Sequence, residues 1–187
     1  GPGGAGRLAR LTVLRPSVIF GADDRFLNLF AGLQKVFPVL PLAGADARLQ
    51  PVWVRDVAIA IAHCLHDDAT IGQTFEACGP EVWTLREIVQ AAGQWAGVRG
   101  GRGRPVVALP SVLGRLQALG LEWLPGRPLM SRDNLDALKL DNVASGLVPG
   151  LAELGIEPAP LDVVGPLILG QSGVQARLDA YRRTAGR

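Results

Sequence analysis

Two short apolar runs, more than any other feature, limit the folds open to this chain. Leu11–Arg15 (LTVLR) ends at Pro16, and Thr74–Cys78 (TFEAC) ends at Gly79-Pro80. Runs of this length and composition, closed by proline or glycine, predict buried parallel strands. Helical patterns lie between them, which favours an α/β fold. Because a doubly wound sheet usually has about five or six strands, we expect a partial sheet here.

The remaining elements are predicted from periodicity, caps and breakers. The expected helices are Arg25–Phe37 with Asp23 or Asp24 as cap, a helix opened by Asp56 and ending near His66, a helix opened by the Thr84–Glu87 capping box and ended by Gly97, Pro110–Leu119, Arg132–Leu140, and short helices after Asp141. The expected further extended segments are Ser17–Gly21, Arg48–Val54 and Pro105–Leu109.

Composition excludes several classes of protein. A net charge of +2 over 187 residues does not call for nucleic acid or an anionic membrane. The basic run Arg99–Arg104 has no aromatic residues for base stacking, so we interpret it as a solvated loop. No apolar run approaches the roughly 20 residues of a membrane span. Cys64 and Cys78 form no disulfide or metal framework, and we expect a cytoplasmic protein.

Several motifs together resemble a known superfamily. Leu14–Gly21 (LRPSVIFG) and Gln50–Ala58 (QPVWVRDVA) resemble the extended and atypical short-chain dehydrogenase/reductase superfamily, which includes NAD-dependent epimerases and dehydratases. The downstream segments that extend the match are Gly72–Pro80, Thr84–Ile88, Leu129–Val143 and Leu154–Leu161. This combination is similar to bacterial relatives of the NAD(P)H-binding accessory subunit of respiratory complex I, from Leu11 to about Leu169.

The resemblance implies a partial Rossmann-type NAD(P)-binding fold, made of its carboxy-terminal strands, with a small and mostly helical carboxy-terminal lobe. We expect residues 1–10 to be a flexible start or tag remnant and residues 11–80 to belong to the Rossmann-type domain. Residues 81–170 would form a substrate or partner lobe, and residues 171–187 a terminal helix and tail.

The same resemblance assigns site residues. It implies that Pro16, Ser17 and Val18 lie beside the nicotinamide end of NAD or NADP. The residues that it assigns to the substrate side of the cleft are Phe20, Arg25, Trp53 and Asp56. The cofactor itself is expected in a longer parent protein, and we expect this chain alone to bind none tightly.

The catalytic pair of the superfamily, a tyrosine with a lysine four residues later, cannot exist in this chain. Its only tyrosine is Tyr181, position 185 is alanine, and the only lysines are Lys35 and Lys139. We therefore predict no catalytic residue. In the family this pair precedes the segment matched by LRPSVIFG, so its absence agrees with a chain that is the carboxy-terminal part of a longer protein.

A glycine-rich phosphate loop is not credible either. Gly1, Gly3 and Gly6 spell G-x-G-x-x-G, but no strand precedes them and a strand rather than a helix follows. A linker or tag remnant explains GPGGAG better.

Two other possible sites, for a metal ion and for a serine nucleophile, are not supported by the sequence. His63 and His66 could share a metal ion on one helix face, but histidines in a last turn also complement the helix dipole. We therefore predict no metal site. The segment Gly170–Val174 (GQSGV) lacks the final glycine of a serine-hydrolase elbow.

Two functions remain open. In the first, the parent protein holds NAD(P)H structurally, with possible association with a respiratory complex, and this chain closes the nicotinamide side of the cleft. In the second, the parent is an NAD(P)-dependent epimerase, dehydratase or reductase, and this chain supplies its substrate pocket. The unpaired edge of Leu11–Arg15 also predicts self-association or pairing with a partner chain.

Overall fold

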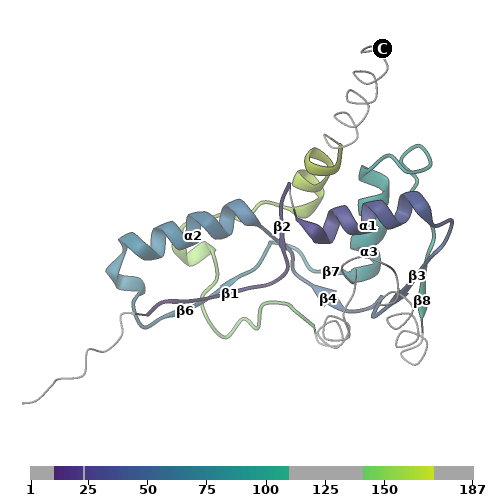
Figure 1. Ribbon diagram of the computed structural model, residues 1–187. Helices are drawn as coiled ribbons and strands as arrows, with labels where there is room; N and C mark the ends of the chain where they lie inside the picture. The colour runs from purple at the N-terminus through teal and green to yellow at the C-terminus, as the bar shows by residue number, and fades with distance from the viewer. Residues whose placement is uncertain (1–10, 23, 110–140, 171–187) are drawn as a thin grey trace, which may run out of the picture.

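The computed structural model describes residues 11–22, 24–109 and 141–170, and these form an α/β structure (Figure 1). Its strands are β1 (Val13–Pro16), β2 (Ile19–Phe20), β3 (Leu40–Ala43), β4 (Arg48–Leu49), β5 (Val52–Trp53), β6 (Thr74–Ala77), β7 (Trp83–Thr84) and β8 (Val106–Leu109). Its helices are α1 (Arg25–Val36), α2 (Val54–His66), α3 (Leu85–Trp95), the 3-10 turns η1 (Asp68–Thr70) and η2 (Ala152–Leu154), and a helical stretch at residues 161–170.

The strands of the described residues pair two by two. Parallel ladders join β1 to β6, β2 to β5 and β3 to β8, whereas β4 and β7 are antiparallel. In the first ladder Val13 lies opposite Thr74 and Pro16 opposite Ala77. The parallel pairing of β1 and β6 confirms the α/β class expected from the two apolar runs.

The prediction that both of these strands are buried is right for β6 and wrong for β1. Phe75, Glu76 and Ala77 of β6 are buried, but Leu11 and Val13 are 60% and 37% exposed. Among the described residues, β1 has a ladder neighbour on one side only, which is β6. Val13 is therefore exposed on an edge strand, whereas Leu14 of the same strand is half-buried.

Local signals predicted the helices well, with one error. Asp24 caps α1, because its carboxylate accepts the N–H of Leu27 at 2.7 Å. The predicted Asp56 cap of α2 is wrong: the helix begins at Val54, and its N-cap position is Trp53, which makes no side-chain cap bond. The chain turns into the helix directly from β5, so Asp56 already lies in the first turn.

The capping box of α3 is confirmed. The Thr84 hydroxyl accepts the N–H of Glu87, and the Glu87 carboxylate accepts the N–H of Thr84 at 2.7 Å. Strand β8 also lies where Pro105–Leu109 was expected. Strand β3 was not expected, because Pro41 interrupts its short apolar run. The helices predicted at Pro110–Leu119 and Arg132–Leu140 lie outside the described residues.

Two hydrophobic cores organise the structure. The first core joins α1, β3 and α3 with Leu161 and Leu169 of the helical stretch. The second joins β5, α2 and β6 with Leu151, Leu154 and Ile156. In Figure 1, α2 covers the β1–β6 ladder, while α1 and α3 lie together on the other side of the molecule. Each core contains residues from before and after position 80. The division of the chain into two domains near residue 80 stays a prediction.

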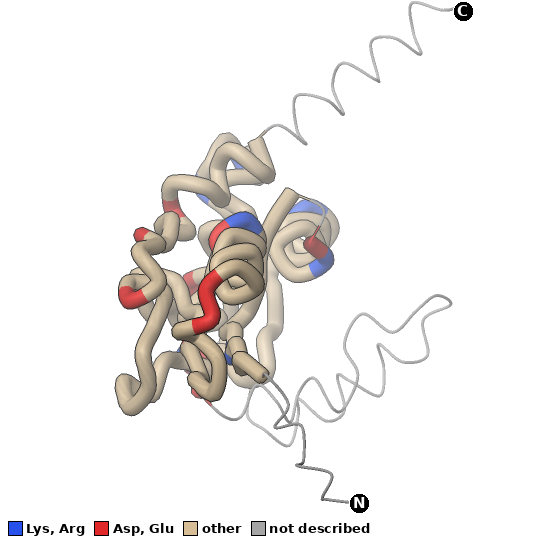
Figure 2. Tube along the Cα trace, turned by 90° about the vertical axis from the view of Figure 1, so that its left-hand side faces the viewer, with Lys and Arg blue, Asp and Glu red and all other residues tan. Residues whose placement is uncertain are grey.

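Charged residues are mixed rather than segregated. Figure 2 shows basic and acidic positions side by side on the helices. None of the helices in the described ranges combines the length and the apolar character needed to cross a bilayer.

Candidate functional site

A buried serine lies at the carboxyl end of β1, where open α/β sheets bind their ligands. Ser17 follows the strand directly, and its N–H donates to the carbonyl oxygen of Ala77 at 3.3 Å. Its hydroxyl donates to the carbonyl oxygen of Asn142 at 2.6 Å and accepts the N–H of Gln50 at 3.2 Å. One side chain thus joins three segments of the chain.

Gln50 continues this network toward both neighbours. Its side-chain Nε2 donates to the carbonyl oxygen of Gly79 at 2.7 Å, and its Oε1 accepts the N–H of Ala144 at 2.8 Å. Its backbone N–H also lies 3.1 Å from the carbonyl oxygen of Asn142. Both ends of the carboxamide are therefore satisfied inside the protein.

A buried carboxylate completes the attachment of residues 141–150, which we call the anchored segment. Glu76 of β6 accepts the N–H groups of Ser145 at 2.9 Å and Gly146 at 3.2 Å. The hydrogen bond from the N–H of Ser145 lowers the pKa of the Glu76 carboxyl most, and the Ser145 hydroxyl lowers it further. Burial has the opposite effect and does not outweigh them. In Figure 1 the anchored segment runs in green below β1 and β6.

The predicted nicotinamide-side residues lie next to this network. Pro16 is exposed at the end of β1, Ser17 is buried, and Val18 is half-buried. The carbonyl oxygen of Val18 accepts the N–H of Val52 at 2.9 Å, so this loop is bound to β5. Since the Ser17 hydroxyl is occupied by internal partners, Pro16 and Val18 provide the accessible surface here.

The predicted cleft residues are only partly brought together. Phe20 and Trp53 are ladder partners in β2 and β5, and the Arg55 guanidinium lies 5.5 Å from the Trp53 ring centroid. Phe20 is 1% exposed and belongs to the first core. Arg25 is exposed at the start of α1. These positions leave Trp53 and Arg25 accessible, whereas Phe20 can only support its neighbours.

Asp56 has a structural partner far along the chain. Its buried carboxylate accepts the N–H of Ala159 at 2.8 Å. This bond attaches the segment before the helical stretch at 161–170 to the first turn of α2. The two half-buried cysteines, Cys64 and Cys78, are free, and burial raises the pKa of the Cys78 thiol.

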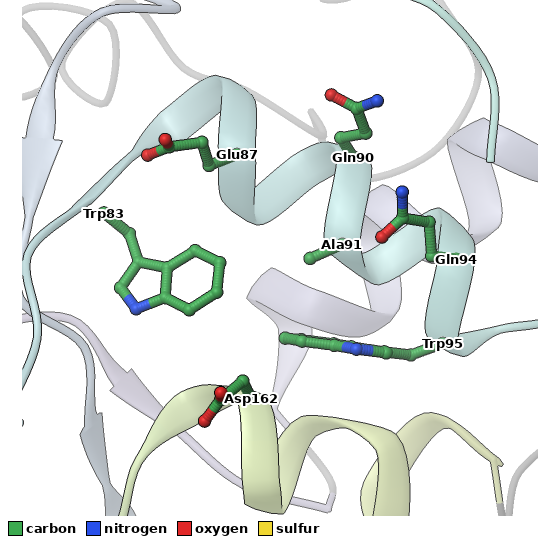
Figure 3. A pocket seen from close by; sticks show the side chains of 7 residues that line it. All are labelled: Trp83, Glu87, Gln90, Ala91, Gln94, Trp95 and Asp162. Atoms are coloured by element: carbon green, nitrogen blue, oxygen red, sulfur yellow. The ribbon is translucent and has the colours of Figure 1, made fainter. Parts of the chain in front are cut away.

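Sequence reasoning missed a second feature, an open groove of about 440 Å³ beside α3. Its lining residues are Trp83, Glu87, Gln90, Ala91, Gln94, Trp95 and Asp162 (Figure 3). The spacing of the α3 members, three or four residues apart, marks one helix face. This spacing, together with the two nearby tryptophans, is the sequence signal from which the groove could have been predicted. In the described part of the chain, no three His, Cys, Asp or Glu side chains gather as metal ligands.

Comparison with solved structures defines the class of fold. The chain superposes on a UDP-glucose 4-epimerase from Thermotoga maritima with a TM-score of 0.53 at 16% identity, covering 89% of this chain and 46% of that one. RMD from Pseudomonas aeruginosa, solved with NADPH, gives 0.53 at 14% identity over 89% of this chain and 49% of that one. The chain therefore has the Rossmann-like fold of these proteins. No protein-family model matches the sequence.

Particular relatives are found by sequence. The chain is 33% identical over 159 residues to the mitochondrial NADH dehydrogenase [ubiquinone] 1 alpha subcomplex subunit 9 of Rattus norvegicus, covering 81% of this chain and 39% of that protein. It is 32% identical over 150 residues to the mitochondrial NADH-ubiquinone oxidoreductase 40 kDa subunit of Neurospora crassa, covering 80% and 38%. The chain is thus homologous to these subunits and spans about two fifths of their length.

Proposed function

We propose that this chain forms the nicotinamide-side wall of an NAD(P) cleft in a protein similar to the complex I subunits, and that it is not catalytic by itself. Its homology to those subunits and its fold, shared with RMD from Pseudomonas aeruginosa, whose structure contains NADPH, support the proposal. The dinucleotide, when bound, supplies a hydride or is held as a structural ligand. In the superfamily the Tyr-x-x-x-Lys pair lies before the segment matched by LRPSVIFG, so reading whether the pair precedes this segment in the whole protein separates the structural role from the epimerase or reductase alternative.

The observation that carries the proposal is the network of Ser17, Gln50 and Asn142 at the carboxyl end of β1. It holds the loop of Pro16 and Val18 in one position at the edge where such folds bind ligands. These two side chains fit the flat face of the nicotinamide ring, because both are apolar, with Pro16 exposed and Val18 half-buried. The residues that could hold phosphates are not found among them, so we assign this wall to the nicotinamide end only.

The proposal extends to assembly and location. The relatives are named as subunits of NADH dehydrogenase, so we include association with a respiratory complex in the proposed role. A cytoplasmic location, expected from the two free cysteines, is part of the same proposal.

A titration with NADPH, followed by its fluorescence, tests the assignment. We expect this chain alone to bind with a Kd above about 100 μM, because a wall without a phosphate site contributes only part of the binding free energy. Submicromolar binding by the chain alone would show a complete site and overturn the proposal.

The second arm uses the full-length protein encoded by the gene. Pro16→Glu places a charge beside the proposed ring position, and we expect it to weaken NADPH binding about tenfold, or about 1.4 kcal/mol. Pro38→Glu, an equally exposed proline after α1, is the matched control and should change the affinity less than twofold. Equal affinities for both variants would show that Pro16 does not face the cofactor.

A further inference from the structure

The groove beside α3 is built from three separate elements. Glu87, Gln90, Ala91, Gln94 and Trp95 lie on one face of α3, Trp83 comes from β7, and Asp162 comes from the helical stretch at 161–170. Figure 3 shows Trp83, Ala91, Trp95 and Asp162 around one space, with the Glu87 carboxylate and the Gln90 carboxamide at its outer margin. A volume of about 440 Å³ lies within the range of small-molecule pockets, roughly 300–1,000 Å³. No part of the proposed NAD(P) wall contributes to it.

The aromatic floor of the groove is held in place before any ligand arrives. A Cβ atom on Gly165 would lie 2.3 Å from Cζ3 of Trp95, so the backbone of the helical stretch packs directly against this ring. The ring centroids of Trp83 and Trp95 are 6.4 Å apart, with an edge-to-face angle of 66°. The indole N–H of Trp83 donates to Glu81 at 3.3 Å. Both rings therefore have fixed orientations.

The polar lining of the groove is acidic. It has two carboxylates, from Glu87 and Asp162, and two carboxamides, from Gln90 and Gln94, and the described lining contains no lysine or arginine. All four polar side chains belong to exposed residues. One Glu87 oxygen accepts from the N–H and the hydroxyl of Thr84, and these bonds lower the pKa of the Glu87 carboxyl.

We propose that this groove binds a guanidinium group, which lies flat on Trp95 and donates to the carboxylate and carboxamide oxygens around it. Tryptophan is the best aromatic partner for a cation. A guanidinium is planar and carries five N–H donors and no acceptor, so it matches a flat floor rimmed by acceptors. An anion would be repelled by Glu87 and Asp162, and a neutral ligand would lack the attraction between opposite charges that a cation gains from them.

The test uses Nα-acetylarginine amide and its uncharged isostere, Nα-acetylcitrulline amide. The assigned indole N–H signals of Trp83 and Trp95 in NMR spectra report binding at this groove. We expect the arginine compound to bind with a Kd of about 1 mM, as befits an open site, and the citrulline compound at least tenfold more weakly. Agmatine and a Gly-Arg-Gly peptide then show whether a free small molecule or a chain-borne arginine is preferred, and binding of either supports the proposal.

Variants locate the site. Asp162→Asn should weaken arginine binding about threefold and Trp95→Phe by a similar factor, with folding checked by circular dichroism. Glu157→Gln removes the same charge from an exposed position outside the lining and should leave the Kd unchanged. Equal binding of the citrulline isostere overturns the proposal. So does an unchanged Kd in Asp162→Asn, or a neutral sugar such as glucose that moves the same signals at lower concentration.

Discussion

The hydroxyl of Ser17 donates a 2.6 Å hydrogen bond to the carbonyl oxygen of Asn142, a residue 125 positions further along the chain. The bond connects the end of the first strand to the anchored segment, which also pairs with Leu49 and Glu76 through isolated parallel bridges. The anchored segment thus lies beside β4 and β6 and pairs with one residue of each strand. Its attachment decides the shape of the proposed nicotinamide wall, and the first prediction concerns this bond.

Replacing Ser17 by alanine should lower the free energy of unfolding by about 1 kcal/mol. The Asn142 carbonyl keeps one partner, the N–H of Gln50 at 3.1 Å, so the loss stays moderate. Urea denaturation measures the total effect, and hydrogen exchange at the Asn142 and Ala144 amides measures the local one. If exchange in the anchored segment did not accelerate, Ser17 would not be what holds it.

The Glu76 carboxylate should make stability depend on acid pH. Because its folded pKa is lowered below the ordinary value of 4.5, it stabilises the fold fully above pH 4.5. This contribution is lost as the pH falls from 4.5 through the folded pKa. Glu76→Gln should therefore cost about 1–2 kcal/mol at pH 7, and the difference from wild type should shrink below pH 4.5.

Urea midpoints measured from pH 7 to pH 3 for both proteins check this. Glu87, whose pKa is also lowered, is present in both and cancels in the difference. A difference that stays constant across this range would show that the Glu76 charge does not contribute. Glu157→Gln, at an exposed carboxylate, should behave as wild type throughout.

Asp56→Ala should destabilise the protein by about 1–3 kcal/mol, because it leaves the N–H of Ala159 without its buried partner. The matched control is Asp46→Ala, which removes an exposed carboxylate paired with Arg86 at 3.3 Å and should cost less than about 0.5 kcal/mol. Equal midpoints for the two variants in urea denaturation would contradict the role assigned to Asp56.

Two glycines should respond in opposite directions to alanine. A Cβ on Gly79 would lie 1.8 Å from the carbonyl oxygen of Pro51, so Gly79→Ala should cost more than about 3 kcal/mol or prevent folding. Gly32 lies inside α1 with no atom within 4 Å of an added Cβ, so Gly32→Ala should stabilise by about 0.5–1 kcal/mol. Thermal unfolding of both variants checks the pair.

The open edge of β1 should promote self-association at high concentration. Val13→Lys places a charge on this edge, where strand pairing would bury it, and should shift the chain toward monomer. Val36→Lys, at an exposed apolar position on α1, is the control. Light scattering that shows a monomer for wild type at the highest concentrations would refute the prediction.

Local signals explain what could be predicted from the sequence. The capping box of Thr84 and Glu87, the Asp24 cap and the periodicity of α1 act over three or four residues, so they are visible without knowledge of the fold. The short apolar run of β6 was recognisable for the same reason. The error at Asp56 arose because an acidic residue near a helix start is compatible with several positions in the first turn.

The sequence by itself determined the order of most elements and the absence of a Tyr-x-x-x-Lys pair, because both depend only on neighbouring residues. Tertiary structure decided which surfaces are free. The exposure of β1, the groove between α3 and Asp162, and the bond between Ser17 and Asn142 all depend on residues distant along the chain. Such contacts form only when several elements pack together, so no local pattern of residues predicts them.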